Sequence, residues 1–408
     1  MESKKPGFDT KALGTRIKAL KQDITVKDTV NTLLLFCMFA FYTLTFFVPK
    51  FYGMTEKYVG LFVFVILAAM CAVNINPLSK IRSKDRYFMA LCLLAVTAFV
   101  NILIVDSGFG CYFVMINFAL IWYLSAEIKF AKWQFYLFGG LYTAMLVYWF
   151  FGVYTWMFAD YSSFAMNTNT AATFTIFSML CAFVFFDALA EKYRIAELLI
   201  VIALVKCFQI SLYHRSRGAF VMLTVFFVLR FLVPRRLWEK KGFLAAVAAL
   251  ATLGSFVFVA VYILVGMSGA NFRMPFFYKN VFSGREAIWL EFWQLFSQKP
   301  LTGIGTNVTI TSFFEFNVHN AMYNILVIHG VIVLALMLFI MYGRWSACRN
   351  GIAQRRVACC ALAAVFAVCF ESYFDVDLIW TNYSLNVFFL LLVLMSQKAT
   401  DYSEKLTG

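Results

Sequence analysis

Residues 30–48 read VNTLLLFCMFAFYTLTFFV, an apolar stretch of 19 residues without a single charged side chain. An α-helix needs roughly 20 such residues to cross the hydrocarbon core of a bilayer. Similar runs recur along the chain, in which 62% of the 408 residues are hydrophobic and only 14% are charged. A soluble domain has about 45–50% apolar and about 25% charged residues. The composition therefore predicts a protein whose apolar surface is covered by lipid.

The whole chain divides into about twelve apolar runs, which predict an all-α, polytopic transmembrane helical bundle. The runs are 30–48, 58–75, 87–105, 110–126, 134–157, 169–188, 195–212, 217–233, 243–265, 319–342, 357–374 and 383–396. The expected organisation is a cytoplasmic segment 1–28, nine spans within 29–265, a large extracytoplasmic loop 266–318, three spans within 319–396, and a cytoplasmic tail 397–408.

The distribution of positive charge predicts the orientation. If the amino terminus is cytoplasmic, 26 of the 35 Lys and Arg residues fall in cytoplasmic segments. Such an excess is what the positive-inside rule requires, and it puts both termini in the cytoplasm. The formal charge of +14 is explained in the same way. No basic stripe interleaved with aromatic residues is present, so we do not expect a nucleic-acid partner.

The cysteines indicate neither a disulfide framework nor a metal site. Most of the ten lie inside apolar runs, and no C-x-x-C pair is present. Thiolate metal sites and disulfide-rich domains need closely spaced cysteines in polar segments. We therefore expect no metal and no cofactor.

One connection, 266–318, is much longer than the others, and long loops in compact proteins are usually functional. Within it Ser283 and Glu286 have the spacing of a capping box, which marks the start of a helix. Four apolar residues then fall on one helical face: Ile288, Phe292, Leu295 and Phe296. We expect an amphipathic helix that lies in the membrane interface.

Two arginines on the expected outer side are candidates for binding phosphate. Arg217 follows Ser216 at the mouth of the eighth run, and Arg285 precedes Glu286 at the start of the loop helix. A guanidinium presents a rigid fork of donors to phosphate oxygens, and this interaction strengthens away from water. The alternative is that both residues only snorkel or cap a helix.

His319 begins the tenth run and is a candidate general base. A neutral imidazole near physiological pH can accept a proton from a hydroxyl group. Asn320 and Tyr323 follow on the same helix and could orient the imidazole ring or a sugar. The alternative is that His319 is merely a polar residue at a helix start.

Lys206 lies within the seventh run, where an ionisable side chain is costly and usually functional. Gln209 is three residues further along, on the same helical face. Glu371 and Asp375, near the outer end of the eleventh run, are candidate partners of Lys206. We expect either a structural ion pair or a role in binding the substrate or accepting a proton.

Several motifs occur in an order that resembles the O-antigen ligase/polymerase family. The motifs are Asn169-Thr170-Ala171-Ala172, Ser216-Arg217-Gly218-Ala219, Gly284-Arg285-Glu286 with Trp289, Pro300-Leu301-Thr302-Gly303-Ile304-Gly305, and His319-Asn320 with Gly330. The resemblance covers about residues 165–345, and the first five runs match only in hydropathy. Twelve spans, cytoplasmic termini and a large late external loop also agree with that family.

The resemblance implies a metal-independent, inverting glycosyltransferase in the bacterial cytoplasmic (inner) membrane, acting at its outer face. The donor would be a glycan on undecaprenyl pyrophosphate, and the acceptor either a lipid-core sugar or another glycan. By position, Arg217 and Arg285 would bind the pyrophosphate, and His319 would activate or orient the acceptor hydroxyl. The candidate substrate-binding residues beside them are Ser216, Lys206, Asn320, Tyr323 and Glu286.

Two other classes of function stay open. A lipid-linked oligosaccharide flippase or other polytopic transporter would show broken spans and ionisable groups near the midplane, and Lys206 favours this reading. A non-catalytic membrane scaffold would tolerate alanine at Arg217, Arg285 and His319. Both a ligase and a polymerase agree with the resemblance, because both use the same donor.

Overall fold

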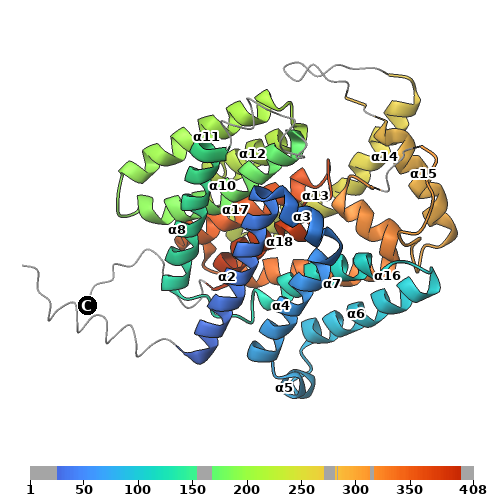
Figure 1. Cartoon of the computed structure of the whole chain (residues 1–408), viewed down its shortest axis with the longest axis horizontal. Coiled ribbons are helices and arrows are strands. Elements are labelled where there is room, and N and C mark those ends of the chain that lie inside the picture. The colour runs from blue at the N-terminus through green and yellow to red at the C-terminus, as the bar shows by residue number, and fades with distance from the viewer. Residues whose placement is uncertain (1–24, 154–167, 271–280, 283, 313–316, 397–408) are drawn as a thin grey trace, which may run out of the picture.

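The computed structural model describes residues 25–153, 168–270, 281–282, 284–312 and 317–396. Within these ranges every regular element is helical and none is a strand, which confirms the predicted all-α class (Figure 1). The predicted segments 1–28 and 397–408 lie outside the described residues, except for the first turn of α2.

A helix, or a pair of consecutive helices, coincides with each of the twelve apolar runs. These elements are α2 (Val26–Phe47), α4 (Val59–Asn74), α6 (Arg86–Ile104), α7 (Phe109–Leu124), α8 (Lys132–Tyr148), α10 (Thr168–Ala190), α11 (Ile195–Tyr213), α12 (Arg217–Phe227), α13 (Lys241–Thr252) with α14 (Gly254–Met267), α16 (Ala321–Cys348), α17 (Arg356–Glu371) and α18 (Ser384–Ser396). Short helical elements connect them: α3 (Pro49–Thr55), α5 (Pro77–Arg82), η1 (Glu56–Tyr58), η2 (Trp149–Val153), η3 (Val228–Leu232), η4 (Arg235–Glu239), η5 (Ile352–Gln354) and η6 (Thr381–Tyr383).

Fewer of these helices than predicted are long and apolar enough to cross a membrane. Seven meet this test in the described residues, and an eighth is formed if α13 and α14, bent by 42°, count as one span. The helices α7, α12, α17 and α18 are shorter than 18 residues. The chain is thus a polytopic helical membrane protein, and its described residues contain seven to eight candidate spans.

The helix α17 is buried at the centre of the bundle. It packs against α10, α12 and α18, and nearly all of its residues from Val357 to Glu371 are buried. A helix that is apolar all round belongs in the core of a bundle, not at its surface. Its many alanines and cysteines let neighbouring helices approach closely. Figure 1 shows α17 and α18 in the middle of the molecule.

The predicted loop helix is present as α15 (Arg285–Gln298), but protein and not lipid covers its apolar face. Ile288, Trp289, Phe292 and Phe296 are buried against α14 and α16. This face is therefore part of the protein interior, and the position of the helix in the membrane interface stays a prediction. The N-cap of α15 is Gly284, with a φ of 87°, and the predicted capping box rests on the residue before it. Ser283 itself lies outside the described residues.

A break in α16 anchors the segment that follows α15. Gly330 has φ 85° and ψ 170°, which only glycine adopts readily. The carbonyl groups of Val327 and Ile328 accept hydrogen bonds from the backbone N–H groups of Ile304 and Gly305. The loop after α15 therefore pairs with the backbone of a broken helix, as the glycines in both segments allow.

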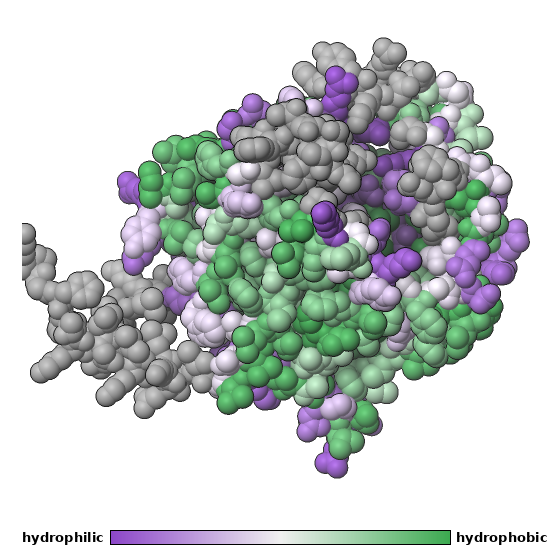
Figure 2. Space-filling view, viewed as in Figure 1, coloured by the Kyte–Doolittle hydropathy of each residue, from purple (hydrophilic) through white to green (hydrophobic). Residues whose placement is uncertain are grey.

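Charged side chains gather at opposite ends of the bundle. At the end that carries α5, Lys80 pairs with Glu127 at 2.7 Å, and Arg344 lies 3.6 Å from the same carboxylate. We call this the α5 end, and the opposite one, where α15 begins, the α15 end. In Figure 2 hydrophobic side chains cover the middle of the visible face, and hydrophilic ones surround the tip formed by α5 and a hollow at the upper right. This pattern fits a bundle with a lipid-facing belt.

Candidate functional site

A cavity of about 40 Å³ at the α15 end brings together residues from four separate segments. The described residues that line it are Asn169, Thr173, Arg215, Ser216, Arg217, Gly218, Arg285, Glu371, Phe374 and Asp375. Three helices, α10, α12 and α15, begin at or next to a lining residue. Helix amino termini carry partial positive charge and unpaired N–H groups, so their convergence favours an anion. We call this space the arginine cavity.

Arg217 enters the arginine cavity because the chain turns sharply between α11 and α12. Arg215 has a φ of 53°, the left-handed conformation that often follows the last residue of a helix. Ser216 is the buried N-cap of α12, and Arg217 is its first residue. One terminal nitrogen of Arg217 donates to the carbonyl of Val281 at 2.7 Å.

The residue after Arg217 is Gly218, and the closeness of Glu371 explains why a small residue stands there. A Cβ atom at this position would lie 2.9 Å from Oε1 of Glu371. Because this contact is closer than real Cβ atoms tolerate, a larger residue at position 218 would force the Glu371 carboxylate to shift. Glu371 is itself only 1% exposed.

Arg285 reaches the same cavity from the first turn of α15. Its guanidinium donates to the carbonyl of Phe374, in the segment after α17. Burial lowers the pKa of Arg285, Asp375 opposes this effect, and the like charge of Arg217 adds to it. The two guanidiniums are therefore close enough to interact electrostatically.

His319 lies beside the arginine cavity and contacts one of its walls. Its Nδ1 is 3.5 Å from Oδ1 of Asp375. The start of α16 is fastened to the end of α17, because Ala321 donates its N–H to the carbonyl of Ser372 and Asn320 donates its side-chain amide to that of Tyr373. These bonds fix the position of the imidazole relative to the carboxylate.

The backbone of His319 is held in an uncommon conformation. Four described residues other than glycine have positive φ, and three of them, Lys84, Asp106 and Arg215, directly follow the cap of a helix. His319, with φ 51°, does not follow a helix. Left-handed conformations of ordinary residues cost energy and cluster at functional sites.

Asp375 links the histidine to one of the arginines. Burial raises the pKa of Asp375, but the adjacent imidazole of His319 and the charge of Arg285 outweigh burial and lower it. The carboxyl group is therefore ionised at neutral pH. Asp377, two residues on, behaves oppositely: burial and the charge of Asp375 raise its pKa, and the neighbouring Glu371 and Thr173 offset only part of this.

Three predicted substrate-binding residues do not line this cavity. The side chain of Asn320 caps α16 and accepts from Ser255, and Tyr323 donates to the carbonyl of Trp289 at 2.9 Å. Glu286 packs against Gly266 of α14, so closely that a Cβ added to Gly266 would lie 2.7 Å from the Cβ of Glu286. Asn320 and Tyr323 therefore bond to protein groups and position α15 and α16, and Glu286 contributes packing between α14 and α15.

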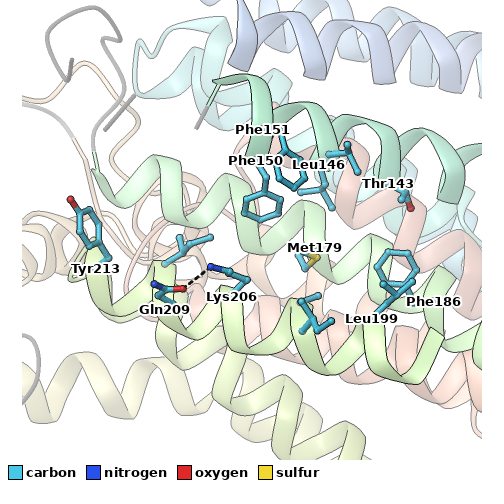
Figure 3. A pocket seen from close by; sticks show the side chains of 14 residues that line it. Thr143, Leu146, Phe150, Phe151, Met179, Phe186, Leu199, Lys206, Gln209 and Tyr213 are labelled. Atoms are coloured by element: carbon cyan, nitrogen blue, oxygen red, sulfur yellow. Dashed lines mark hydrogen bonds between the residues drawn. The ribbon is translucent and has the colours of Figure 1, made fainter. Parts of the chain in front are cut away.

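Lys206 lies in a second and much larger cavity, of about 740 Å³, between α8, α10 and α11. Its ammonium group donates to Oε1 of Gln209 at 3.1 Å, and the remaining walls are almost wholly apolar. Figure 3 shows the two side chains facing each other among aromatic and aliphatic neighbours. The predicted pairing of Lys206 with Glu371 or Asp375 is therefore wrong. The partner of Lys206 is Gln209, and both carboxylates line the arginine cavity instead. We call this second space the apolar groove.

The two cavities adjoin along two helices. Tyr213 lines the apolar groove, and Arg215, two residues later, lines the arginine cavity. On α10, Thr173 faces the arginine cavity and Met179 faces the groove. Six helical residues rise about 9 Å, so the groove begins roughly one and a half turns from the charged residues.

Sequence reasoning missed Asp377 and Thr173 entirely and gave Asp375 the wrong partner. A polar pair, Asp375 and Asp377, directly after an apolar run was the available signal. Searches against known protein families and against curated proteins find no match to this chain. The arrangement of the site residues is therefore the basis for any statement about function.

Proposed function

We propose that this chain is a membrane glycosyltransferase of the O-antigen ligase/polymerase type. It would transfer or polymerise a glycan from an undecaprenyl-pyrophosphate donor at the outer face of the bacterial cytoplasmic membrane, with twelve spans and both termini cytoplasmic. The observation that carries the proposal is the meeting of Arg217, Arg285 and Asp375 in one cavity, with His319 on Asp375.

The cationic side of the arginine cavity suits a pyrophosphate. Two guanidiniums and three helix amino termini face one small volume. At about 40 Å³ it has room for only a few water molecules. A phosphate therefore enters when Arg217 and Arg285 leave the carbonyl groups of Val281 and Phe374. Charge-assisted bonds to phosphate are stronger than bonds to a neutral carbonyl, which favours this exchange.

The pair of His319 and Asp375 supplies the base for a single displacement. The acceptor hydroxyl oxygen attacks the anomeric carbon, and the bond from that carbon to the pyrophosphate oxygen breaks with its electrons on the leaving group. The imidazole takes the hydroxyl proton, and the ionised Asp375 stabilises the resulting imidazolium. Arg217 and Arg285 stabilise the negative charge that develops on the pyrophosphate. One displacement inverts the anomeric centre.

The apolar groove supports a lipid-linked donor. It runs along α11 from Tyr213 to Leu199, a rise of about 21 Å. Its aromatic and aliphatic walls would take part of an isoprenoid chain whose head group lies in the arginine cavity. Lys206 and Gln209 give it one polar point, near enough to the outer end for the ammonium to snorkel.

Reconstitution with undecaprenyl-pyrophosphate-linked glycan tests the proposal. Wild type should release undecaprenyl pyrophosphate and form a new glycosidic bond, and Arg217→Ala, Arg285→Ala and His319→Ala should each lose most of this activity. Arg82→Ala is the matched control, because Arg82 is exposed at the end of α5. Equal release from wild type and all three site variants would refute the enzyme.

A flippase or other transporter is the second candidate, and two observations favour it. Lys206 lies within a candidate span and lines the larger of these two cavities. The chain also has a span broken at Gly330 and the bent pair α13–α14. Transporters use such broken helices around a central site. A transporter would move the glycolipid across proteoliposomes with its glycosidic bond intact.

A further inference from the structure

A third cavity, of about 310 Å³, lies at the α5 end, away from the arginine cavity. Its walls come from α11, η3, η4 and the first residue of α17. Three guanidiniums line it: Arg230, Arg235 and Arg356. We call it the basic pocket. Neither the proposed glycosyl transfer nor the apolar groove uses any of its charged residues.

The innermost charged groups of the basic pocket are one carboxylate and two guanidiniums, which together carry a net positive charge. Oδ1 of Asp187 accepts from Arg230 and, at 3.0 Å, from Nε of Arg356. The Asp187 side chain is only 2% exposed, so one buried carboxylate neutralises one of two guanidiniums. A buried network of this kind keeps its charges fixed in place. An anion that enters the pocket would complete the neutralisation.

Arg235 adds a third positive charge at the mouth of the pocket. It is exposed, and no ion pair to it is found among the described residues. The opposing charge at the rim is Glu197, which is also exposed. In addition, α17 begins at Arg356, so the partial positive charge of its amino terminus acts on the same side. The pocket as a whole therefore attracts anions.

The remaining wall of the basic pocket faces the lipid. Ile200 lines the interior, while Val201 and Phe231 are 55% and 43% exposed on the belt that hydrophobic side chains form. By the positive-inside rule this end lies at the cytoplasmic leaflet. A ligand that suits both the guanidinium wall and the apolar wall has a phosphate group that binds the arginines and hydrocarbon chains that lie beside α11 and η3.

We propose that the basic pocket binds the phosphate of an anionic phospholipid from the inner leaflet. The guanidiniums of Arg235 and Arg356 contact the phosphate oxygens, and the acyl chains lie against Val201 and Phe231. A free phosphate shares the head-group chemistry but lacks the chains. The pocket lies at the opposite end of α17 from the arginine cavity, so this proposal does not depend on the proposed function.

Native mass spectrometry of the purified full chain in detergent tests the proposal. The probes are phosphatidylglycerol, phosphatidylcholine with matched chains, and inorganic phosphate. The informative variant is Arg235→Gln, and Arg236→Gln is the matched control, because Arg236 is its exposed neighbour and does not line the pocket. Circular dichroism and thermal unfolding establish that both variants are folded.

The expected result is saturable binding of phosphatidylglycerol that Arg235→Gln weakens about fivefold, the effect of about 1 kcal/mol per arginine at a lipid surface. Arg236→Gln should bind as wild type does, and phosphatidylcholine should bind weakly to all three. Equal binding by wild type and Arg235→Gln, or an equal loss in both variants, would overturn the proposal. Displacement of the lipid by millimolar inorganic phosphate would identify a free anion as the ligand and overturn the lipid assignment.

Discussion

The imidazole Nδ1 of His319 lies 3.5 Å from Oδ1 of Asp375, although His319 precedes α16 and Asp375 follows α17. Asp375 also interacts electrostatically with Arg285. One carboxylate therefore interacts both with the candidate base His319 and with Arg285, a candidate phosphate-binding residue. A change in the charge of either residue alters the electrostatic environment of the other.

Replacing Asp375 by Asn should lower kcat more than it changes KM. The amide keeps the size of the side chain but loses the charge that would stabilise a protonated His319, which we expect to cost about 10- to 100-fold in rate. Asp375→Glu should recover part of the activity. Steady-state rates of undecaprenyl pyrophosphate release measure both. A purely structural role would instead reduce thermal stability in step with activity.

Substituting lysine for either arginine of the arginine cavity should reduce the activity. Arg217→Lys and Arg285→Lys keep the charge but lose the planar fork that binds two phosphate oxygens. We expect each to lose at least tenfold in kcat/KM, and alanine at the same position about 10²- to 10³-fold. Arg82→Lys, at the α5 end, serves as control and should be unchanged. Full activity of both site variants would show that the fork is not used.

Lys206→Met should affect binding of the donor and not the chemical step. The methionine preserves the apolar bulk of the groove but removes the ammonium that contacts Gln209. We expect a several-fold higher KM for the lipid-linked donor and a kcat within about twofold of wild type. Lys192→Met, on an exposed turn, is the comparison. A collapse of kcat with KM unchanged would move Lys206 into the reaction centre.

Gly330→Ala should be strongly destabilising. Its φ of 85° disfavours any side chain, and a Cβ would lie 2.1 Å from the carbonyl oxygen of Leu301. We expect a loss of about 3 kcal/mol or more in the free energy of unfolding. Gly242→Ala is the control, because nothing lies within 4 Å of its Cβ and it sits in a helix. Thermal unfolding in detergent measures both variants.

The loop after α15 should loosen in strong acid. Burial slightly raises the pKa of Glu291, but hydrogen bonds from Ser312 and Thr311 outweigh it and lower the pKa to about 2. A lowered pKa stabilises the folded loop above the unfolded value near ~4.3, and the effect is lost as the pH falls through about 2.

Hydrogen exchange of residues 299–312, corrected for intrinsic rates, checks this window. Protection in wild type should fall between about pH 4 and pH 2, whereas Glu291→Gln should be weakly protected and change little. Glu191→Gln, at an exposed turn, should follow wild type. Protection in Glu291→Gln equal to wild type at pH 7 would show that the hydrogen bonds to the Glu291 carboxylate do not stabilise the loop.

Hydropathy located the helices well but not their surroundings. The run 357–374 has the composition of a span, yet α17 is enclosed by other helices, because apolar side chains suit lipid and a protein core equally well. The same ambiguity explains α15, whose apolar face is covered by α14 and α16. The periodicity of apolar residues identifies the apolar face of a helix, but it does not distinguish a face covered by lipid from one covered by protein.

The site was predictable where a residue type and its position were unusual in themselves. Arg217, Arg285 and His319 stood out as polar residues at the expected outer edge, and the structure brings them to one region. The role of Asp375 was not readable, because its contact with His319 depends on hydrogen bonds between the start of α16 and the end of α17. Lys206 drew attention for its cost in a span, but the neutral Gln209 on its own helix is its partner.

Because α17 carries Arg356 at one end and Glu371 at the other, a single stiff rod about 24 Å long joins the basic pocket to the arginine cavity. A sliding motion of this rod along its axis would alter both places together. An anion bound at Arg356 and a ligand bound near Glu371 would therefore contact the two ends of one continuous helix.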